Sequence, residues 1–295
     1  MKFIRVFLMS MVAAVLVSCG TTNTVPITGR QQKLMVNDGE VLGLSTQQYQ
    51  EFMKTAKLST DANKTAMVKR VGQNLANAVV NYLNANGLQN DVQNYKWTFN
   101  LVQDKQVNAW CMPGGLIVVY EGILPVTQDE ASLAIVLGHE IAHAVARHSA
   151  EQMSTQMRQQ YGLQIGSVVA GALGMGQNTQ SIVQAIAAQG FNFKNLKYSR
   201  DHENEADHMG LIFAAMAGYD PQVAITFWQR MAAQSSNQTS EFLSDHPSDA
   251  TRIKNIQGWM PEALKYYKPK AATTQTSAAK TSTTKTFRVS SKKKK

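Results

Sequence analysis

The chain has 295 residues, a formal net charge of +9 and an apolar fraction of 44%. This length suits one large domain, or one domain with flexible ends, and leaves ample material to bury a core. Two cysteines are present, and a single thiol in the body of the chain excludes a fold held by internal disulfide bonds. The charge is uneven, because residues 268–295 carry nine Lys and Arg and no acid, which leaves residues 19–267 close to neutral.

The first 18 residues have the order of charge and apolar character of a secretion signal. Lys2 and Arg5 precede an apolar run that is too short to span a bilayer comfortably. The run ends L-V-S-C-G, which resembles the bacterial lipobox and implies cleavage before Cys19, lipidation of its thiol and membrane anchoring. We therefore expect a lipoprotein signal peptide over residues 1–18. The alternatives are an uncleaved anchor and an ordinary signal with a chance cysteine.

The signal is followed by a segment that we expect to be a linker and a poorly ordered lead-in, over residues 19–44. The folded body is expected to begin where Ser45-x-x-Gln48 has the form of a capping box that opens a short helix. A longer helix is predicted from about Asp61 to Asn86, because apolar residues recur at every fourth position within it.

The hydrophobic period then changes from that of a helix to that of a strand. Apolar and polar residues alternate from Trp97 to Leu101, as in a half-buried strand. Residues 107–112 and 116–120 read as two further strands, separated by the chain-breaking sequence P-G-G. A small sheet is therefore predicted in the first half of the chain.

The second half of the chain is predicted to be mainly helical. One helix follows the capping box Thr127-x-x-Glu130 and runs to about Ser149. Further helical segments are expected over residues 161–175, which are apolar and rich in small side chains, and over 201–217, 220–233 and, as a pair, 247–267. The predicted fold class is α+β and helix-rich with one small β-sheet, in a domain over residues 45–267.

The C-terminal segment has a different composition from the body. Residues 268–295 contain almost no bulky apolar side chains and are predicted to form a disordered basic tail. Such a tail can contact anionic lipid or a cell-wall polymer, or can act only as a solubilising segment. No nucleic-acid partner is expected for an exported chain.

The sequence G-H-E-I-A-H places two histidines four residues apart on a predicted helix. At about 100° per residue, His139 and His143 share one face, so both rings can reach one ion. Neutral imidazoles are good zinc ligands. Glu140 lies one step round the helix, where it can take a proton from a zinc-bound water. The alternative is a surface helix that carries these histidines by coincidence.

Two histidines need a third protein ligand to form a catalytic zinc site with one open position. Glu203 and Asp207 are four residues apart on a later predicted helix and share a face. Glu203 can bind the ion while Asp207 hydrogen-bonds a liganding histidine from behind. Glu205 lies about 200° away from Glu203 and is the alternative ligand if this register is wrong.

Five stretches, in this order, resemble zinc metallopeptidases of the HtpX, BepA, LoiP and Ste24 type: N-A-W-C-M-P-G-G, H-E-I-A-H, S-R-D-H-E-N-E-A-D-H-M-G, A-G-Y-D-P and D-H-P-S-D-A-T-R. The resemblance covers about Val25 to Tyr267. It implies a compact zincin-like α+β domain, one zinc ion, and Glu203 as the third ligand, because this residue opens E-x-x-A-D. The chain looks most like the small, lipid-anchored branch, since it lacks multiple membrane spans and a helical repeat array.

The resemblance also implies roles for residues outside the ligand set. A strand at the edge of the sheet can pair with an extended peptide, and the matching residues are Asn108, Ala109, Trp110, Cys111 and Met112. An ordinary core strand is the alternative. In relatives the residue matching His246 lies over the cleft, where it either gates the open metal position or hydrogen-bonds the oxyanion. Arg252 either supplies positive charge there or anchors the loop through an acid pair.

The remaining histidines and the second cysteine have simpler interpretations. His148 lies about 180° round the predicted helix from His139 and is expected to face away from it. His202 and His208 flank the Glu203 face without sharing it, so a surface or packing role is expected for all three. Cys111 is expected to be a buried, inert thiol, with an inhibitory metal-binding thiolate as the alternative.

These patterns predict a zinc metalloendopeptidase that acts on misfolded or unassembled proteins of a bacterial cell envelope. The lipid on Cys19 would hold it to a membrane facing the periplasm, with the outer membrane favoured by Gly20. One alternative is a lipid-anchored chaperone or assembly factor that keeps a latent zinc site. A zinc-dependent peptidoglycan hydrolase ranks last, because its motifs normally differ from H-E-x-x-H.

Overall fold

A computed structural model describes residues 21–168, 179–235, 242, 246 and 250–269 of the chain. The predicted signal peptide, Cys19, the tail from residue 270 and part of the predicted helix over residues 161–175 lie outside these residues. Within the described residues, no helix combines the length and the apolar character that a membrane span requires.

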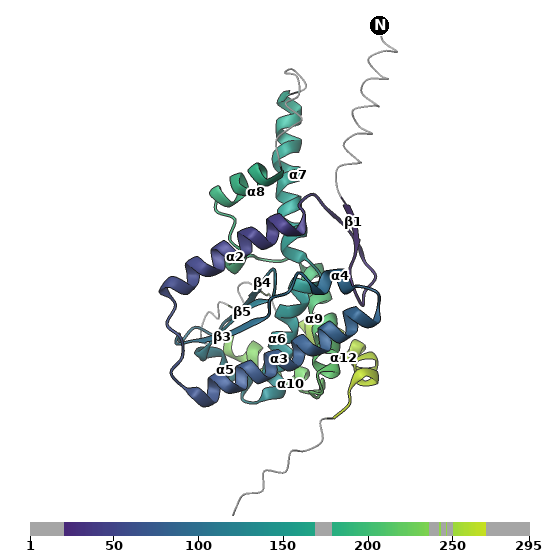
Figure 1. The fold of residues 1–295 in the computed structure, drawn as a ribbon. Helices are drawn as coiled ribbons and strands as arrows, with labels where there is room; N and C mark the ends of the chain where they lie inside the picture. The colour runs from purple at the N-terminus through teal and green to yellow at the C-terminus, as the bar shows by residue number, and fades with distance from the viewer. Residues whose placement is uncertain (1–20, 169–178, 236–241, 243–245, 247–249, 270–295) are drawn as a thin grey trace, which may run out of the picture.

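The architecture is α+β and helix-rich, as predicted, but it contains two small sheets instead of one (Figure 1). The larger sheet has the strand order β3 (Thr98–Val102), β5 (Leu116–Tyr120), β4 (Ala109–Met112). The central strand β5 pairs parallel with β3 and antiparallel with β4, so that Ile117 lies opposite both Phe99 and Cys111. β4 therefore forms one edge of this sheet.

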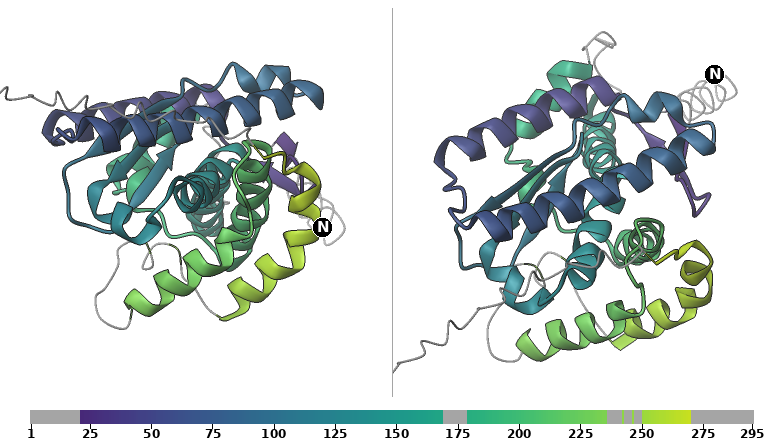
Figure 2. Two further views of the ribbon diagram at one scale, coloured as in Figure 1. Left: turned by 90° about the horizontal axis from the view of Figure 1, so that it is seen from below. Right: turned by 60° about the horizontal axis from the view of Figure 1, so that its bottom comes forward.

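Helices cover the larger sheet and make up most of the molecule. They are α2 (Asp38–Thr55), α3 (Ala62–Ala85), α4 (Gln89–Val92), α5 (Leu124–Thr127), α6 (Glu130–Val145), α7 (His148–Val168), α8 (Thr179–Ala188), α9 (Arg200–Met216), α10 (Val223–Ser235) and α12 (Ala250–Tyr266), with 3-10 helices η1 (Glu121–Ile123) and η2 (Phe193–Asn195). Seen from below, α6 lies in the middle, with α3 on one side and α10 and α12 on the other (Figure 2). The helix that carries H-E-I-A-H is thus the central one, and nearly all of it is buried.

The two faces of the larger sheet pack into two separate apolar clusters. Successive side chains of a strand point to opposite faces. Along β5, Ile117 and Val119 join the cluster that contains the buried sides of α3, α6 and α9. Val118 and Tyr120 join a second cluster with apolar residues of α2, α7 and α8. All five residues of β5 are buried, which explains why this strand reads as a continuous apolar run.

The segment predicted to be a poorly ordered lead-in is folded. β1 (Thr21–Thr24) and β2 (Gln31–Leu34) form an antiparallel hairpin, which is the second sheet. α2 then begins at Asp38, capped by Asn37, whose side chain accepts from the backbone N–H of Glu40. Ser45 lies inside α2, where its hydroxyl donates to the Pro113 carbonyl at 2.7 Å. The predicted capping box at Ser45 is therefore wrong, because Asn37 and Glu40 form the capping box of this helix.

The predicted limits of the central helix need correction at both ends. The N-cap of α6 is Asp129, whose side chain accepts from the Ser132 N–H, and not Thr127. The helix ends at Val145 instead of near Ser149. Arg147 has a φ of 56°, in the left-handed region that interrupts a helix, and α7 begins directly afterwards at His148. The chain therefore turns just after the second histidine of the motif.

Two other helical predictions have different outcomes. α3 agrees closely with its prediction, because Asp61 caps it and Gly87 follows it with a φ of 77°. The predicted helix pair at the end of the body is wrong, since the described residues from Ala250 onward form one helix, α12, with Pro261 inside it.

The backbones of α6 and α9 touch where the two helices cross. A Cβ added to Gly210 would lie 2.6 Å from the His139 nitrogen, and one added to Gly138 would lie 2.7 Å from the Gly210 carbonyl oxygen. Any side chain here would push the helices apart, so both positions require glycine. This close crossing brings the histidines of α6 against the acidic residues of α9.

Candidate active site

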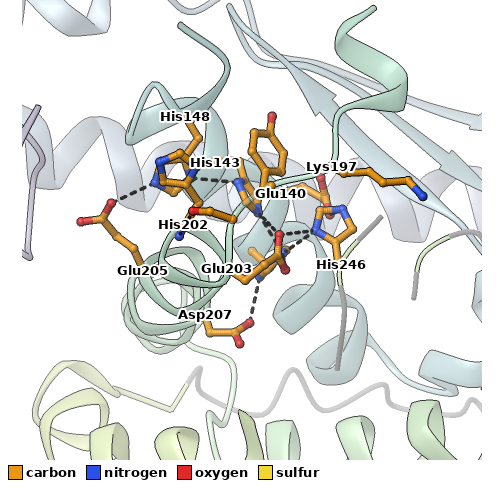
Figure 3. A network of polar contacts seen from close by, with 12 residues as sticks. Glu140, His143, His148, Lys197, His202, Glu203, Glu205, Asp207 and His246 are labelled. Carbon is orange, nitrogen blue, oxygen red and sulfur yellow. Dashed lines mark hydrogen bonds and ion pairs between the residues drawn. The ribbon is translucent and has the colours of Figure 1, made fainter. Parts of the chain in front are cut away.

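Four side chains converge at the crossing of α6 and α9. His139 and His143 come from α6, Glu203 comes from α9, and His246 approaches from a later segment. Figure 3 shows His143, Glu203 and His246 pointing toward one another. The Nε2 atoms of the two α6 histidines are 3.1 Å apart. The Glu203 carboxylate lies 3.5 Å from His139 Nε2 and 3.4 Å from His143 Nε2. The structure therefore brings the three predicted metal ligands together.

The spacing of these three ligand atoms fits a zinc ion. Ligands about 2.0–2.1 Å from a tetrahedral ion lie about 3.3 Å from one another. The two imidazole nitrogens are 3.1 Å apart, and each lies 3.4 or 3.5 Å from one of the two Glu203 oxygens. Burial by itself would lower the pKa of His139, but its contacts with Asp207 and Glu203 raise that pKa to about 9. The surroundings thus favour positive charge at this point, as a cation site should.

The third ligand is held in its charged form. Burial would raise the pKa of Glu203, but the charge of His246 and the hydrogen bonds of His139 and His143 bring it well below the usual range. Burial lowers the pKa of His143 well below that of a free imidazole. An anionic carboxylate beside a neutral imidazole matches the ligand chemistry of zinc.

Glu140 lies beside the ligand set without belonging to it. Its side chain is buried, with Oε1 3.5 Å from His246 Nε2. No described residue hydrogen-bonds to Oε1, and a buried carboxylate oxygen without a partner is costly. Burial raises the pKa of Glu140, while the backbone N–H of Cys111 donates a hydrogen bond to it. A carboxylate with a raised pKa and an oxygen that accepts no hydrogen bond is suited to accept a proton from water.

His246 closes the remaining side of the cluster. Its Nδ1 lies 3.0 Å from Glu203 Oε1 and 3.1 Å from His139 Nε2. The side chain is buried, and its backbone N–H donates to the Phe242 carbonyl at 2.8 Å. In this arrangement His246 stands where a fourth ligand, or a substrate, would approach the ion.

Asp207 and Arg252 support His139 from behind. Asp207 Oδ1 lies 2.9 Å from His139 Nδ1, which leaves the other ring nitrogen free for a metal, as predicted for this aspartate. Arg252 Nη2 and Nε lie 2.6 Å from the two oxygens of Asp207, and its guanidinium stacks 3.5 Å from the centre of the Trp228 ring. These contacts favour an anchoring role for Arg252 over direct contact with a substrate.

The sequence pattern of peptidase family M48 matches residues 62–260, a span that contains each of these site residues. The chain belongs to peptidase family M48.

Relatives in this family include proteins from mitochondria and from bacteria. The chain is 39% identical over 172 residues to the mitochondrial metalloendopeptidase OMA1 of Schizosaccharomyces pombe. This alignment covers 57% of the chain and 48% of that protein. It is 30% identical over 246 residues to human OMA1, covering 81% of this chain and 46% of that protein. The beta-barrel assembly-enhancing protease of Escherichia coli is 24% identical over 241 residues, covering 80% and 47%. The chain thus spans about half the length of the curated relatives it matches.

The M48 site opens beside the edge strand of the sheet. Residues 108–111 line a crevice together with Glu140, Tyr198 and His246. β4 pairs with β5 along one side only, and the η2 segment, which contacts β4, also lines this crevice. The side chains of β4 are buried in the two apolar clusters, and the pairing of a peptide with Asn108–Met112 stays a prediction.

The prediction for His148 is wrong. Because α6 ends at Val145, His148 does not continue round the same helix. It is fully buried, its Nδ1 lies 2.8 Å from His143 Nδ1, and its Nε2 lies 2.9 Å from Glu205 Oε2 (Figure 3). A separation of 180° requires an unbroken helix, and the break occurs at the left-handed Arg147, where the sequence contains no glycine to indicate it.

The other predictions for histidines and for the thiol have mixed outcomes. His208 points away from the M48 site and lies 2.7 Å from Glu262. His202 is partly buried, contacts Glu151 at 3.1 Å and stacks on His148, so it belongs to the polar network behind the site. Cys111 is buried, as expected, and is not among the four residues of the ligand cluster; burial raises the pKa of its thiol well above the usual range.

Proposed function

We propose that the chain is a zinc metalloendopeptidase that hydrolyses peptide bonds in misfolded or unassembled cell-envelope proteins. The observation that carries this proposal is the buried set His139, His143 and Glu203 at zinc-ligand spacing, with Glu140 directly beside it. Membership of a peptidase family and relatives named metalloendopeptidases support the same activity.

The chemistry divides between the metal and the chain. Zinc, when bound, lowers the pKa of water to about 7 and polarises a peptide carbonyl. Glu140 accepts the proton of the attacking water and passes it to the leaving amine, for which its raised pKa and its free Oε1 are suited. Asp207, held by Arg252, orients His139 so that its Nε2 faces the ion.

Substrate binding in this proposal depends on the edge strand. A peptide in extended form adds to β4, and Asn108, Ala109, Trp110, Cys111 and Met112 supply the pairing edge beside Glu140. Main-chain pairing recognises extended shape more than side chains, so unfolded proteins are suitable substrates. His246 stands in the approach to the ion, where it either gates the site or binds the oxyanion.

The proposed location is the envelope of a bacterium. The signal over residues 1–18 and the lipobox ending at Cys19 support a lipoprotein that faces the periplasm, with the outer membrane favoured over the inner one. Similarity to a bacterial protease named for beta-barrel assembly agrees with an envelope role. The basic tail over residues 268–295 is proposed to be a disordered segment.

A chaperone or assembly factor with a latent zinc site is the second proposal. It would need no general base, whereas Glu140 is present, buried and placed beside the ligands. The peptidase is therefore favoured.

The test compares the purified full-length chain with its Glu140→Gln variant at equal zinc content, using casein as substrate. Loss of a general base should lower cleavage by about 10²–10⁴-fold with zinc content unchanged. Glu262→Gln is the matched control, because this glutamate pairs with His208 away from the site and should cleave like the parent. If parent and Glu140→Gln each bind one zinc ion and neither cleaves casein, the chaperone proposal is favoured.

A further inference from the structure

His148 connects a metal-binding imidazole to a carboxylate that does not touch the metal site. It is fully buried between His143 and Glu205, with its two ring nitrogens 2.8 Å and 2.9 Å from them. In Figure 3 the three side chains follow one another away from the ligand cluster. The roles proposed for the zinc ligands and for Glu140 do not explain why His148 lies between His143 and Glu205.

The direction of these hydrogen bonds follows from the role of His143. Its Nε2 faces Glu203 and His139, so a metal bound there leaves the proton on Nδ1. That N–H can only donate, so His148 must accept it on Nδ1. The proton of His148 then lies on Nε2 and donates to the Glu205 carboxylate. With the His143 proton on Nδ1 and the His148 proton on Nε2, both hydrogen bonds have one donor and one acceptor.

Glu205 is itself held in place by the N-terminal hairpin. Thr28, in the turn between β1 and β2, donates to Glu205 Oε1 at 2.5 Å, and Arg30 Nε donates to Oε2 at 2.8 Å. Arg30 also pairs with both oxygens of Glu151 on α7, at 2.9 and 2.8 Å. Both carboxylate oxygens of Glu205 thus accept hydrogen bonds, from Thr28 on one side and from Arg30 and His148 on the other.

The two α6 histidines are thus supported in parallel ways. His139 is held by Asp207, which is held by Arg252. His143 is held by His148, then by Glu205, which is held by Arg30. Both series end on a carboxylate paired with an arginine, and a carboxylate behind a metal-bound imidazole fixes the ring and raises its basicity.

We infer that His148 is a positioning residue for the zinc ligand His143, and that Glu205 and Arg30 extend this support to the N-terminal hairpin. The inference rests on the proposed zinc site and adds to it a series of hydrogen bonds behind His143 that the H-E-x-x-H motif does not contain. Its consequence is measurable as zinc affinity, independently of any proteolysis.

The test measures the zinc dissociation constant of the full-length chain by competition with a chromophoric chelator. His148→Leu fills the same space without hydrogen bonds and should weaken zinc binding about 10–100-fold. His148→Gln retains an acceptor and a donor and should recover most of that loss, to within about 3-fold of the parent. The matched control is His208→Leu, because His208 is also hydrogen-bonded to a glutamate, at 2.7 Å, and stacked on a ring, that of Trp259.

Unfolding of the zinc-free proteins separates positioning from packing. If His148 only packs, His148→Leu and His148→Gln change the unfolding midpoint but bind zinc as His208→Leu does, and the inference is wrong. If His148→Leu does not fold, Glu205→Gln tests the same relay, and a zinc affinity equal to that of the parent refutes it. A parent that binds no zinc overturns both this inference and the proposed function. A parent that binds zinc but cleaves no casein contradicts only the proposed peptidase activity.

Discussion

The crossing of α6 and α9 gives a sharp test of how the site is assembled. Gly210→Ala adds a single methyl group that would lie 2.6 Å from the His139 nitrogen and 2.8 Å from the Gly138 carbonyl carbon. Ordinary contacts begin at 3.4 Å, so α9 must move away from α6 by up to about 0.8 Å at this point. Glu203 lies two turns earlier on the same helix, at 3.5 Å from His139 Nε2. The shift therefore widens the separation that zinc requires.

The expected magnitude is obtained by comparison with a glycine that has space around it. Gly258 lies in α12 and has no heavy atom within 4 Å of an added Cβ. Gly258→Ala should therefore stabilise the chain by up to about 1 kcal/mol through helix propensity alone. Gly210→Ala has the same propensity gain but an overpacking cost of about 1–3 kcal/mol. The free energies of unfolding of the two variants should differ by about that cost.

Urea unfolding of the zinc-free proteins measures this difference, and chelator competition measures the zinc dissociation constant. We expect Gly210→Ala to be less stable than Gly258→Ala and to bind zinc about 10-fold or more weakly, as for other losses of ligand support. Equal stability and equal zinc affinity of the two variants would show that the helices can separate without consequence. In that case the close crossing would not be what positions Glu203.

Three further predictions concern the gate, acid sensitivity and the metal. His246→Ala removes the side chain that faces the open position, so casein cleavage per bound zinc should rise; a loss of cleavage would instead assign His246 to the oxyanion. Burial would raise the pKa of Glu151, but His202 and Arg30 lower it to about 2. Because that pKa is below its ordinary value, Glu151 should stabilise the fold above about pH 4.5 and lose this effect as the pH falls toward 2. Urea unfolding of zinc-free Glu151→Gln should therefore show a deficit of about 1 kcal/mol at pH 6 that vanishes near pH 2, whereas a constant deficit would contradict the assignment. Zinc at 100 times its dissociation constant should raise the free energy of unfolding by about 2.7 kcal/mol, and no change on adding a chelator would argue against a bound ion.

Sequence spacing was sufficient for those site residues that share a helix. His139 with His143, and Glu203 with Asp207, are four residues apart, so their common faces follow from helix geometry. Which acid of α9 reaches the metal was also predictable, because Glu205 points elsewhere and in fact pairs with Arg30. Local periodicity likewise predicted α3 and the three strands of the larger sheet.

The errors occurred where two signals of similar strength competed, or where none existed. In both cases of a wrong N-cap, a Ser or Thr was predicted although the true cap is an Asn or Asp. The observed caps are Asn37 and Asp129. The N-terminal hairpin has short strands of four residues each, and five of these eight positions are exposed, so its hydrophobic pattern is weak. The turn at Arg147 depends on a non-glycine residue with positive φ, for which the sequence contains no local indication.

That turn decides which residues support the metal site. A helix continued past Val145 would carry His148 about 180° away from His139, whereas the observed break returns it to His143. Arg147 itself is fixed by ion pairs to Asp38 at 3.0 Å and to Asp91 at 2.9 Å, which come from α2 and α4. The positive φ of Arg147, which is unfavourable for a residue other than glycine, is therefore stabilised by segments far away in the chain. The second support of the zinc site depends on tertiary contacts, and this is why the motif alone could not predict it.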